Sequence, residues 1–533
     1  MPRRIRLSTT DTNKGDKRNN KIIDSTAVLA ARTLKSGMMA GITSPARPWM
    51  RLVTPDPDLA EREDVRSWLH LVTQRMHTVF LRSNLYNALP TLYGDQGTFG
   101  TACMTILEDE KDVVRFQTPP LGSYMIATNE RGITDTFFRD IPMTVRQVVR
   151  RFVNMNDPES VRWSKVSITV KNLWGIGNLD AVVPICHVII MNKDYDQSKL
   201  HSRYKRYSST YYEKNSNDQN KLLSVSGYDD FPVVCPRWDV TGDDVYGTSC
   251  PGMDSLGDIK ALQLMQRRKA EAIEKMVRPP MVGPSSLRTA KASILPGDVT
   301  YLDAREGQQK FEPIYAVNPR ISELVMDIKD HQMRVSRAYY EDLFLMMAQS
   351  DRREVTAREI DERHEEKLLM LGPTLEREND ELLDPMVSRV FNIMERRGMI
   401  PPAPDVLQGQ AIKVEYISIM AQAQKMVAMA GLERFATFVG NMSKAMPGAL
   451  DKINQDNLVD EYGDMTGISP RILRTDDEAN QIRTKRAEMQ QQQMQAEQQK
   501  IQAQSVRDLA QAHQASGGDL SKLMGTPQPQ QGA

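Results

Sequence analysis

The residues whose type and spacing come closest to a catalytic motif are the adjacent carboxylates Asp243 and Asp244, in the segment Thr241–Gly247. Paired aspartates hold two metal ions in template-dependent polymerases. The same Gly-Asp-Asp sequence is also ordinary turn chemistry, and no second carboxylate motif on a neighbouring hairpin accompanies it. We interpret the segment as a polar turn and keep a polymerase that uses Asp243 and Asp244 as an alternative.

Three further motifs could support catalysis, and each is incomplete. His364 and Glu365 lie in a helical segment, but a zinc protease needs a second histidine where Leu368 stands. The segment WGIGNLD has two glycines of a dinucleotide-binding loop and lacks the third, and no G-x-x-x-x-G-K-[ST] loop occurs in the chain. None of the seven histidines stands beside a nucleophile motif such as G-x-S-x-G. The residues therefore predict no enzyme, no metal and no cofactor.

Composition limits the class of protein. The chain has 533 residues, enough for three or four structural units, and its 69 Lys and Arg balance 69 Asp and Glu. With no net charge, any contact with DNA must be local. The four cysteines show no C-x-x-C pairing, which argues against a zinc site or a disulfide framework and favours a reducing compartment. The basic start lacks an apolar signal region and no run approaches about 18 apolar residues, so we expect neither secretion nor a membrane span.

The elements begin behind a basic arm that is expected to be disordered. A helix starts at Ser25 and ends near Gly41, before Pro45, and Trp49–Leu52 is extended. A second helix is expected over Pro57–Asn87, with one apolar side. The residues of that side are Leu59, Val65, Leu69, Val72, Met76, Val79 and Phe80.

The next segments change to strand-like patterns. Antiparallel hairpins are expected between Gly97 and Asp140, followed by a helix over Met143–Phe152 with Thr144 as its N-cap. Further strands are expected at VSITV, AVVPICHVIIM, SSTYYEK and FPVVCPRW. The first half of the chain is therefore a mixed α+β body.

Two amphipathic helices mark the middle of the chain. The helix Met253–Arg278 has an apolar stripe and a basic stripe, and Pro279-Pro280 ends it. The helix Arg320–Tyr340 follows a region rich in Pro and Gly that holds two small strands. The apolar stripe of the first helix contains Leu256, Ile259, Leu262, Gln266, Ile273 and Met276; the seam of the second contains Ile321, Leu324 or Val325, Ile328, Val335 and Tyr339. The basic residues are Lys260, Arg267, Lys275 and Arg278 on the first helix and Lys329, Arg334 and Arg337 on the second.

The segment that follows, LFLMMAQSDRREVTAREI, changes from a Met-rich apolar run to a charged helix start. Thr356 and Glu359 form a capping box, and a long helix with bends at Pro373 and Pro385 is expected to end at Gly398. One strand follows at Ile412, Val414 and Tyr416. Beyond Met420 the apolar residues are helical in spacing, and the Gln-rich end passes into a disordered tail.

Three stretches together carry a family resemblance: SGMMAGITSPARPWMRL, DDVYGTSCPGMDSLGDIKALQLMQRRKAEAIEKMVRPPM and VTAREIDERHEEKLLMLGPTLERENDELLDPMVSRVFNIMERRGMIPPAPD. They resemble the portal proteins, or head-to-tail connectors, of short-tailed bacteriophages, over most of the chain from about Ser25 to the Gln-rich tail. The resemblance implies a mainly helical α+β portal fold and a cyclic ring of identical subunits, twelve in assembled portals. It also implies these parts: a disordered basic arm (1–24), a wing (25–250), a first stem helix (251–278), a small α/β clip (279–318), a second stem helix (319–340), a tunnel loop (341–353), a long wing helix with a return strand (354–420), a helical crown (421–510) and a disordered tail (511–533).

The resemblance further implies a non-enzymatic channel for packaging and ejection of double-stranded DNA at one capsid vertex of a virion assembled in the host cytoplasm. The expected partners are the terminase large subunit, which supplies the ATP-driven motor, the major capsid protein, the scaffold and tail adaptor proteins. The tunnel-loop residues expected to meet DNA are Leu345, Met346, Met347, Gln349, Ser350, Arg352 and Arg353. The stem residues expected to do so are the seven basic side chains named above.

Alternatives remain at each level. Leu343, Leu345 and Met346 fit an ordinary helix core, since a Met-rich stripe is usually buried. The basic stem residues fit a solvated helix face or pairing with acids of a neighbouring subunit. For the whole chain, a helical scaffold or linker protein without a channel is the other interpretation, supported by the long C-terminal helices and the Gln-rich tail.

Overall fold

The computed structural model describes the chain in pieces, and the text below concerns those pieces alone. They are residues 22–56, 59–60, 62–153, 162–214, 222–278, 281–282, 312–313, 321–349, 371–418, 420, 435–442, 454, 457–459, 462 and 476–515. The chain divides into two compact units, Met1–Ala428 and Met429–Ala533. Each unit is described by itself.

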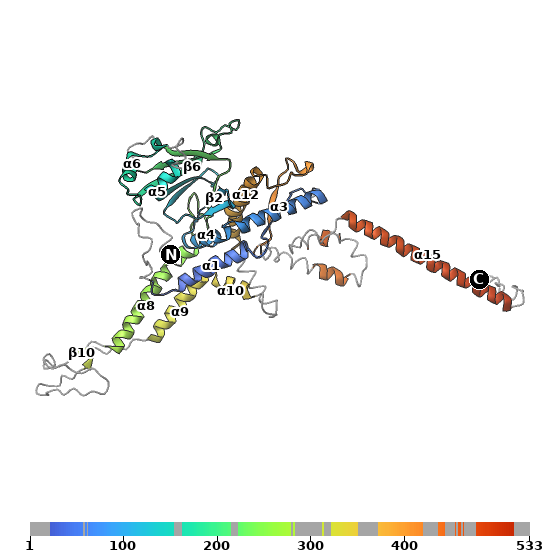
Figure 1. Cartoon of the computed structure of the whole chain (residues 1–533). Coiled ribbons are helices and arrows are strands. Elements are labelled where there is room, and N and C mark those ends of the chain that lie inside the picture. Colours follow the sequence, from blue (N-terminus) through green and yellow to red (C-terminus); the bar gives the residue numbers. More distant parts are fainter. Residues whose placement is uncertain are drawn as a thin grey trace. The chain divides into compact units, whose positions relative to one another are not determined.

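Helices form the centre of the first unit (Figure 1). They are α1 (Thr26–Ile42), α3 (Glu63–Arg82), α4 (Leu85–Phe99) and α12 (Asp384–Arg396). Their apolar sides share one core, which includes Leu34, Phe80, Leu89 and Val390. At its edge β1 (Met50–Val53) pairs antiparallel with β12 (Lys413–Tyr416), so the extended segment and the return strand are both confirmed.

The single helix expected over Pro57–Asn87 is wrong, because the chain breaks between α3 and α4. Asn84 turns away from the helix to strand β3: its side-chain amide donates to Phe116 O (2.7 Å) and its Oδ1 accepts from Phe116 N (2.9 Å). The hydroxyl of Ser83 accepts from Leu85 N (3.2 Å). Ser and Asn side chains compete in this way with the helical hydrogen bonds of the backbone. The α4 helix was not predicted.

Two antiparallel sheets follow. The first has the order β3-β2-β9, with β2 (Met104–Asp109), β3 (Val113–Gln117) and β9 (Val233–Val234). The second has five strands in sequence order: β4 (Tyr124–Thr128), β5 (Thr134–Thr144), β6 (Val182–Met191), β7 (Tyr207–Glu213) and β8 (Leu222–Tyr228). The hairpins expected between Gly97 and Asp140 are confirmed, whereas β8 was missed.

Short helices pack against the five-stranded sheet. They are α5 (Val145–Val148), the π-helix Val149–Val153 and α6 (Ile168–Gly175). The N-cap at Thr144 is confirmed, with Gln147 completing a capping box. The strand expected at VSITV is wrong: the hydroxyl of Ser167 accepts from Val170 N (3.2 Å) and starts α6, so an N-cap overrides the strand preference of β-branched residues. The strand expected at FPVVCPRW shrinks to Val233–Val234, because proline lies next to it on one side and one residue away on the other.

Two long helices leave the core side by side (Figure 1). They are α8 (Leu256–Val277), which follows the short α7 (Pro251–Asp254), and α9 (Ile321–Ala338), so both expected helices are confirmed. Between them β10 (Met281–Val282) pairs antiparallel with β11 (Glu312–Pro313), which confirms two small strands. After a left-handed residue at Tyr340 (φ 54°), the chain continues in α10 (Glu341–Gln349).

The last part of the first unit is helical again. Thr356 and Glu359 lie outside the described residues. Residues 371–378 are helical, a π-helix spans Asn379–Leu383, and α12 follows. The π-helix precedes Pro385, which has no N–H for the regular ladder; the bends expected at Pro373 and Pro385 stay predictions. Gly398 (φ 65°) ends the helix as expected.

Short 3-10 helices in this unit lie at Trp163–Lys165, Ser202–Tyr204 and Asp405–Leu407. Among the described residues no helix is long and apolar enough to cross a membrane. Asp24 is buried, so the chain is already packed before the expected end of its basic arm.

The second unit contains a helical segment at residues 435–442 and the 40-residue helix α15 (Asp476–Ala515). The described side chains along the Gln-rich part of α15 are exposed. The Gln-rich end is therefore helical and continues to Ala515, past residue 511, where the tail was expected to begin. A helix that is polar all round gains little from packing.

Candidate functional site

The candidate site is the α8–α9 pair with the segments that hold its base. The two helices pack through Leu262 on α8 and through Ile328 and Val335 on α9, all buried. The other members of the expected α8 stripe are less covered: Ile259 and Gln266 are half-buried, and Leu256, Ile273 and Met276 are 41–48% exposed. One apolar seam and much uncovered apolar surface therefore coexist on this helix.

Polar contacts tie the two helices together beside that seam. His331 Nδ1 lies 2.7 Å from Asp258 Oδ1, and Arg334 lies 3.7 Å from the same carboxylate. Arg334 also pairs with Asp330, one turn earlier on α9. The hydrogen bond and the charge of Asp330 raise the pKa of the Arg334 guanidinium. Arg334 thus braces α9 against α8.

The other six basic stem residues are exposed: Lys260, Arg267, Lys275 and Arg278 on α8 and at its end, and Lys329 and Arg337 on α9. The three from Lys260 to Lys275 are spaced seven and eight residues apart, so they share one side of α8, called here the α8 basic face, with the exposed Glu271 and Glu274 between and beside them. Within the described part of the chain none of the six has an ion pair. Their charges are available to an external anion.

Asp24 joins both helices to the start of α1. Its Oδ2 accepts from Gln266 Nε2 on α8 (3.0 Å) and from Gln332 Nε2 on α9 (3.0 Å). Its Oδ1 accepts from Thr26 N (2.9 Å). Burial alone would raise the pKa of this carboxyl, but the hydrogen bonds from Thr26, Gln332 and Gln266 together lower it. The carboxylate is therefore held in its charged form.

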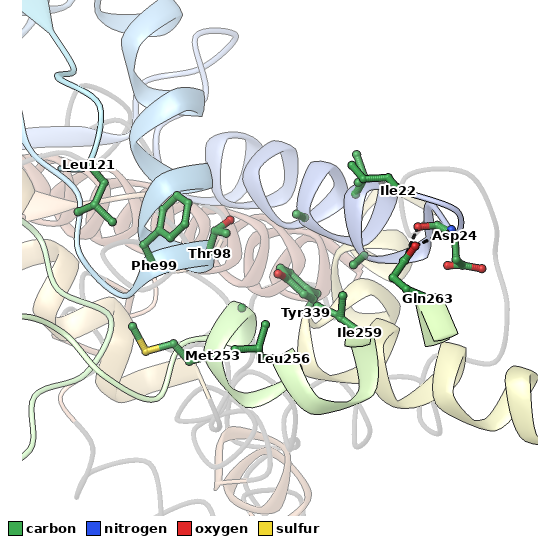
Figure 2. Close-up of a pocket in the computed structure, with 14 residues that line it drawn as sticks. Ile22, Asp24, Thr98, Phe99, Leu121, Met253, Leu256, Ile259, Gln263 and Tyr339 are labelled. Carbon is green, nitrogen blue, oxygen red and sulfur yellow. Dashed lines mark hydrogen bonds between the residues drawn. The ribbon is translucent and has the colours of Figure 1, made fainter. Parts of the chain in front are cut away.

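Gln263 adds a second connection from α8. Its Oε1 accepts from the backbone N–H of Ile23 (2.7 Å) and of Asp24 (3.0 Å), and its Nε2 donates to Asp24 O (2.9 Å). Figure 2 shows this pair at one end of an apolar pocket of about 520 Å³. Side chains of Phe99, Leu121, Met253 and Leu256 line the pocket. The hydrogen bonds of Asp24 and Gln263, called here the polar clamp, thus join the α8–α9 pair to the start of α1 beside the apolar pocket.

The segment expected to be a tunnel loop begins as the helix α10, and its place in a channel stays a prediction. Leu343 and Phe344 of α10 are buried in the main core, whereas Leu345 is 45% exposed. A Cβ added to Gly37 of α1 would lie 2.0 Å from Phe344 Cδ1, so the ring packs directly on the glycine backbone. Met346, Met347 and Gln349 belong to α10, with side chains outside the description, and Ser350, Arg352 and Arg353 lie outside the described residues.

The alternative interpretation of this segment as helix core is therefore correct for Leu343. It is wrong for Leu345, whose side chain is partly exposed.

Asp243 and Asp244 form an exposed turn, in which Asp244 N donates to Thr241 O (3.3 Å) and Gly242 has a left-handed backbone (φ 60°). They border a second pocket of about 930 Å³, in which Glu381 is bound by the guanidinium of Arg237 (2.7 and 3.1 Å). No cluster of three or more metal-binding side chains occurs among the described residues. The arrangement matches the turn interpretation.

Sequence reasoning missed the clamp at Asp24. A signal was available, because Gln266 interrupts the apolar stripe of α8, and an amide in such a position requires a buried hydrogen-bond partner. The partner could not be identified, since 242 residues separate Gln266 from Asp24.

Comparison with known proteins decides the family. The family model described as "Bacteriophage head to tail connecting protein" matches residues 1–473. The chain belongs to this family of connector, or portal, proteins.

Two relatives extend the same result. The portal protein of Salmonella phage epsilon15 is 46% identical over 490 residues, which cover 92% of this chain and 86% of that protein. The probable portal protein of Bordetella phage BPP-1 is 40% identical over 491 residues, with the same coverage. A chain of the virion of the native gene transfer agent particle aligns at a TM-score of 0.33 with 9% identity, a likeness that supports no argument.

Portal proteins are structural components and not enzymes, which agrees with the incomplete catalytic motifs of this connector. The polymerase interpretation of Asp243 and Asp244 is therefore set aside. The question that remains is how a portal chain uses the α8–α9 pair.

Proposed function

We propose that copies of this portal protein close into a ring, of twelve subunits when assembled, at one vertex of a phage capsid. In this ring α8 and α9 form the wall of the channel through which double-stranded DNA enters and leaves. The match of the connector family model to residues 1–473 carries the portal function. The exposed basic face on the stem pair supports the placement of these helices at the channel.

The α8 basic face suits a sliding duplex. Its three cations Lys260, Arg267 and Lys275 exceed the two glutamates of the same side by one charge, and a ring would repeat this small positive excess in every subunit. A protein that binds six to ten phosphates loses about 10³ to 10⁵ in affinity over ordinary salt changes. A conduit needs weaker binding, and isolated Lys and Arg side chains on a helix provide it. Lys329, Arg337 and Arg278 are candidates of the same kind, whereas Arg334 is proposed as a brace because of its ion pairs.

The segment after Phe344 is proposed to reach toward the channel axis, with Leu345, Met346, Met347, Gln349, Ser350, Arg352 and Arg353 as its contact residues. The burial of Leu343 and Phe344 supports this, since it fixes the point from which the segment leaves the core. Methionine side chains are flexible and polarizable and can touch a moving duplex without fixing its register.

The partners follow from the same proposal. The chain lacks a nucleotide-binding loop, so a separate ATP-driven terminase large subunit would dock on the clip, residues 279–318. Tail adaptor proteins would take that place later, and the major capsid protein and scaffold would contact the body of the ring in the virion.

The ring is tested with the purified full-length protein by electron microscopy and light scattering. We expect closed annuli with a central hole and a mass several times that of one chain. A scaffold or linker protein would give monomers, dimers or open assemblies, and such a result under virion-assembly conditions would refute the proposal.

A further inference from the structure

Two of the four cysteines lie together in the structure although 132 residues separate them in sequence. Cys103 and Cys235 are buried, with 2% and 4% of their surfaces exposed, and their sulfur atoms are 2.7 Å apart. Both are free thiols, as are Cys186 and Cys250. No sulfur contact joins the latter two to another cysteine in the described part of the chain.

The backbone around the pair has the geometry that a disulfide requires. In the β2–β9 ladder Met104 lies opposite Val234, so the preceding pair of positions is Cys103 and Cys235. Ala102 N donates to Pro236 O (3.2 Å) and Ile106 N to Pro232 O (2.8 Å), which makes the cysteines a non-hydrogen-bonded cross-strand pair. Such pairs have Cα atoms about 4.5 Å apart, within the range of about 4.4–6.8 Å found for disulfides.

We propose that Cys103 and Cys235 are an oxidative modification site and form an intrachain disulfide when the protein meets a small-molecule disulfide. The thiolate of one cysteine attacks the oxidant and displaces one small thiol, which gives a mixed disulfide. The second thiolate then attacks the cysteine sulfur of that mixed disulfide and displaces the second small thiol. Two electrons and two protons pass from the protein to the oxidant, and one S–S bond forms.

The proposed disulfide would link the two ends of a large segment of the chain. The five-stranded sheet, β3 and the helices α5 and α6 all lie between Cys103 and Cys235 in sequence. Only the chain segments at these two residues connect that lobe covalently with the helical core. A disulfide here would join the two chain segments that connect residues 104–234 to the helical core. In the unfolded state it would limit how far these residues can separate from the core.

The rate of oxidation follows from burial. Burial and the neighbouring Cys235 thiol raise the pKa of Cys103, which keeps the thiolate scarce, and access requires local opening. We therefore expect slow oxidation that is absent in a reducing cytoplasm and proceeds in an oxidising medium. That setting, a virion released from its host, rests on the proposed function, whereas the chemistry of the pair does not.

The test uses full-length reduced protein incubated with oxidised glutathione below its unfolding temperature, then alkylated under denaturing conditions and digested with trypsin. Each cysteine falls in a separate peptide, and those of the pair are Ser83–Lys111 and Leu222–Arg237. We expect these two peptides to be recovered linked, from a band that runs as a single chain without reductant. Cys186 and Cys250 should remain alkylated.

A Cys235→Ser variant is the matched control and should give no linked peptide. Oxidation should also raise the thermal midpoint of the wild-type protein by roughly 2–5 °C, with no rise in the variant. Recovery of both cysteines as free thiols after prolonged oxidation, or their linkage to Cys186, Cys250 or another subunit, would overturn the inference. Either result would leave the portal function untouched.

Discussion

Asp24 is one residue that binds both α8 and α9. One carboxylate oxygen accepts from a glutamine of α8 and a glutamine of α9, so a single side chain fixes the separation of the two helices where they leave the core. Hydrogen bonds to a charged group are stronger than neutral ones, and a buried donor left without a partner costs further free energy. The α8–α9 pair is therefore held by the polar clamp at Asp24 in addition to its apolar seam.

Replacement of Asp24 by alanine should lower the free energy of unfolding by about 1.5–3 kcal/mol at neutral pH. Asp24→Asn should cost less, because the glutamine amides can turn to offer an oxygen. The pKa of Asp24 is lowered in the folded protein, so its contribution is present above the ordinary value of 3.8 and is lost as the pH falls through the lowered pKa. Denaturant unfolding at several pH values measures this.

The Asp243→Asn variant serves as the control for that experiment, since Asp243 lies in an exposed turn. It should change stability little at any pH. A wild-type advantage over Asp24→Asn that stays unchanged down to the lowest pH at which the protein is folded would contradict the assigned role of the carboxylate.

At the scale of elements, α10 is anchored to α1 by the close packing of Phe344 on Gly37. Phe344 occupies the space where any side chain at position 37 would stand. The left-handed backbone of Tyr340 and the tilted contact of its ring with Trp238 (6.3 Å between centroids) set the direction in which α10 leaves α9. The segment proposed to reach the channel therefore starts from a fixed origin.

A Gly37→Ala substitution tests this anchor. Alanine favours the helix by about 1 kcal/mol, but its Cβ would lie 2.0 Å from Phe344 Cδ1, and overpacking of a core costs about 1–3 kcal/mol. We expect a net loss of stability by thermal unfolding. Adding Phe344→Leu should recover part of the loss, and a Gly37→Ala protein more stable than wild type would show that the contact is absent.

The elements also show how far sequence reasoning reaches. Periodicity identified α8 and α9, because a 3.6-residue repeat of apolar positions needs no knowledge of distant partners. It failed at VSITV, where the Ser167 cap decides, and at Asn84, whose amide binds a strand 32 residues away. The partners in contacts between residues far apart, such as Asp24 for Gln266 or Cys235 for Cys103, could not be predicted, because a local pattern does not identify them.

At the scale of the whole molecule, the chain has no net charge and therefore no general attraction to DNA. The proposed attraction to DNA must come from local cations such as those of α8. Replacing Lys260, Arg267 and Lys275 with glutamine should leave rings intact and weaken DNA binding. For each phosphate that the variant no longer neutralises, the slope of log affinity against log salt should fall in magnitude by about 0.9. Fluorescence anisotropy over a salt series measures both the affinity and this slope.

The matched control replaces Lys111, Arg131 and Arg150 with glutamine, three exposed residues outside α8 and α9 that carry the same total charge. It should keep the wild-type salt dependence. Equal weakening by the two triple variants would mean that only net charge matters and that the α8 basic face does not touch DNA.

The most direct measurement is a symmetry-resolved electron microscopy reconstruction of the assembled ring. The account predicts a closed annulus in which α8 and α9 surround the bore and Lys260, Arg267 and Lys275 face it. A ring with these helices on its outer rim, or with the α8 basic face buried against a neighbouring subunit, would contradict the account.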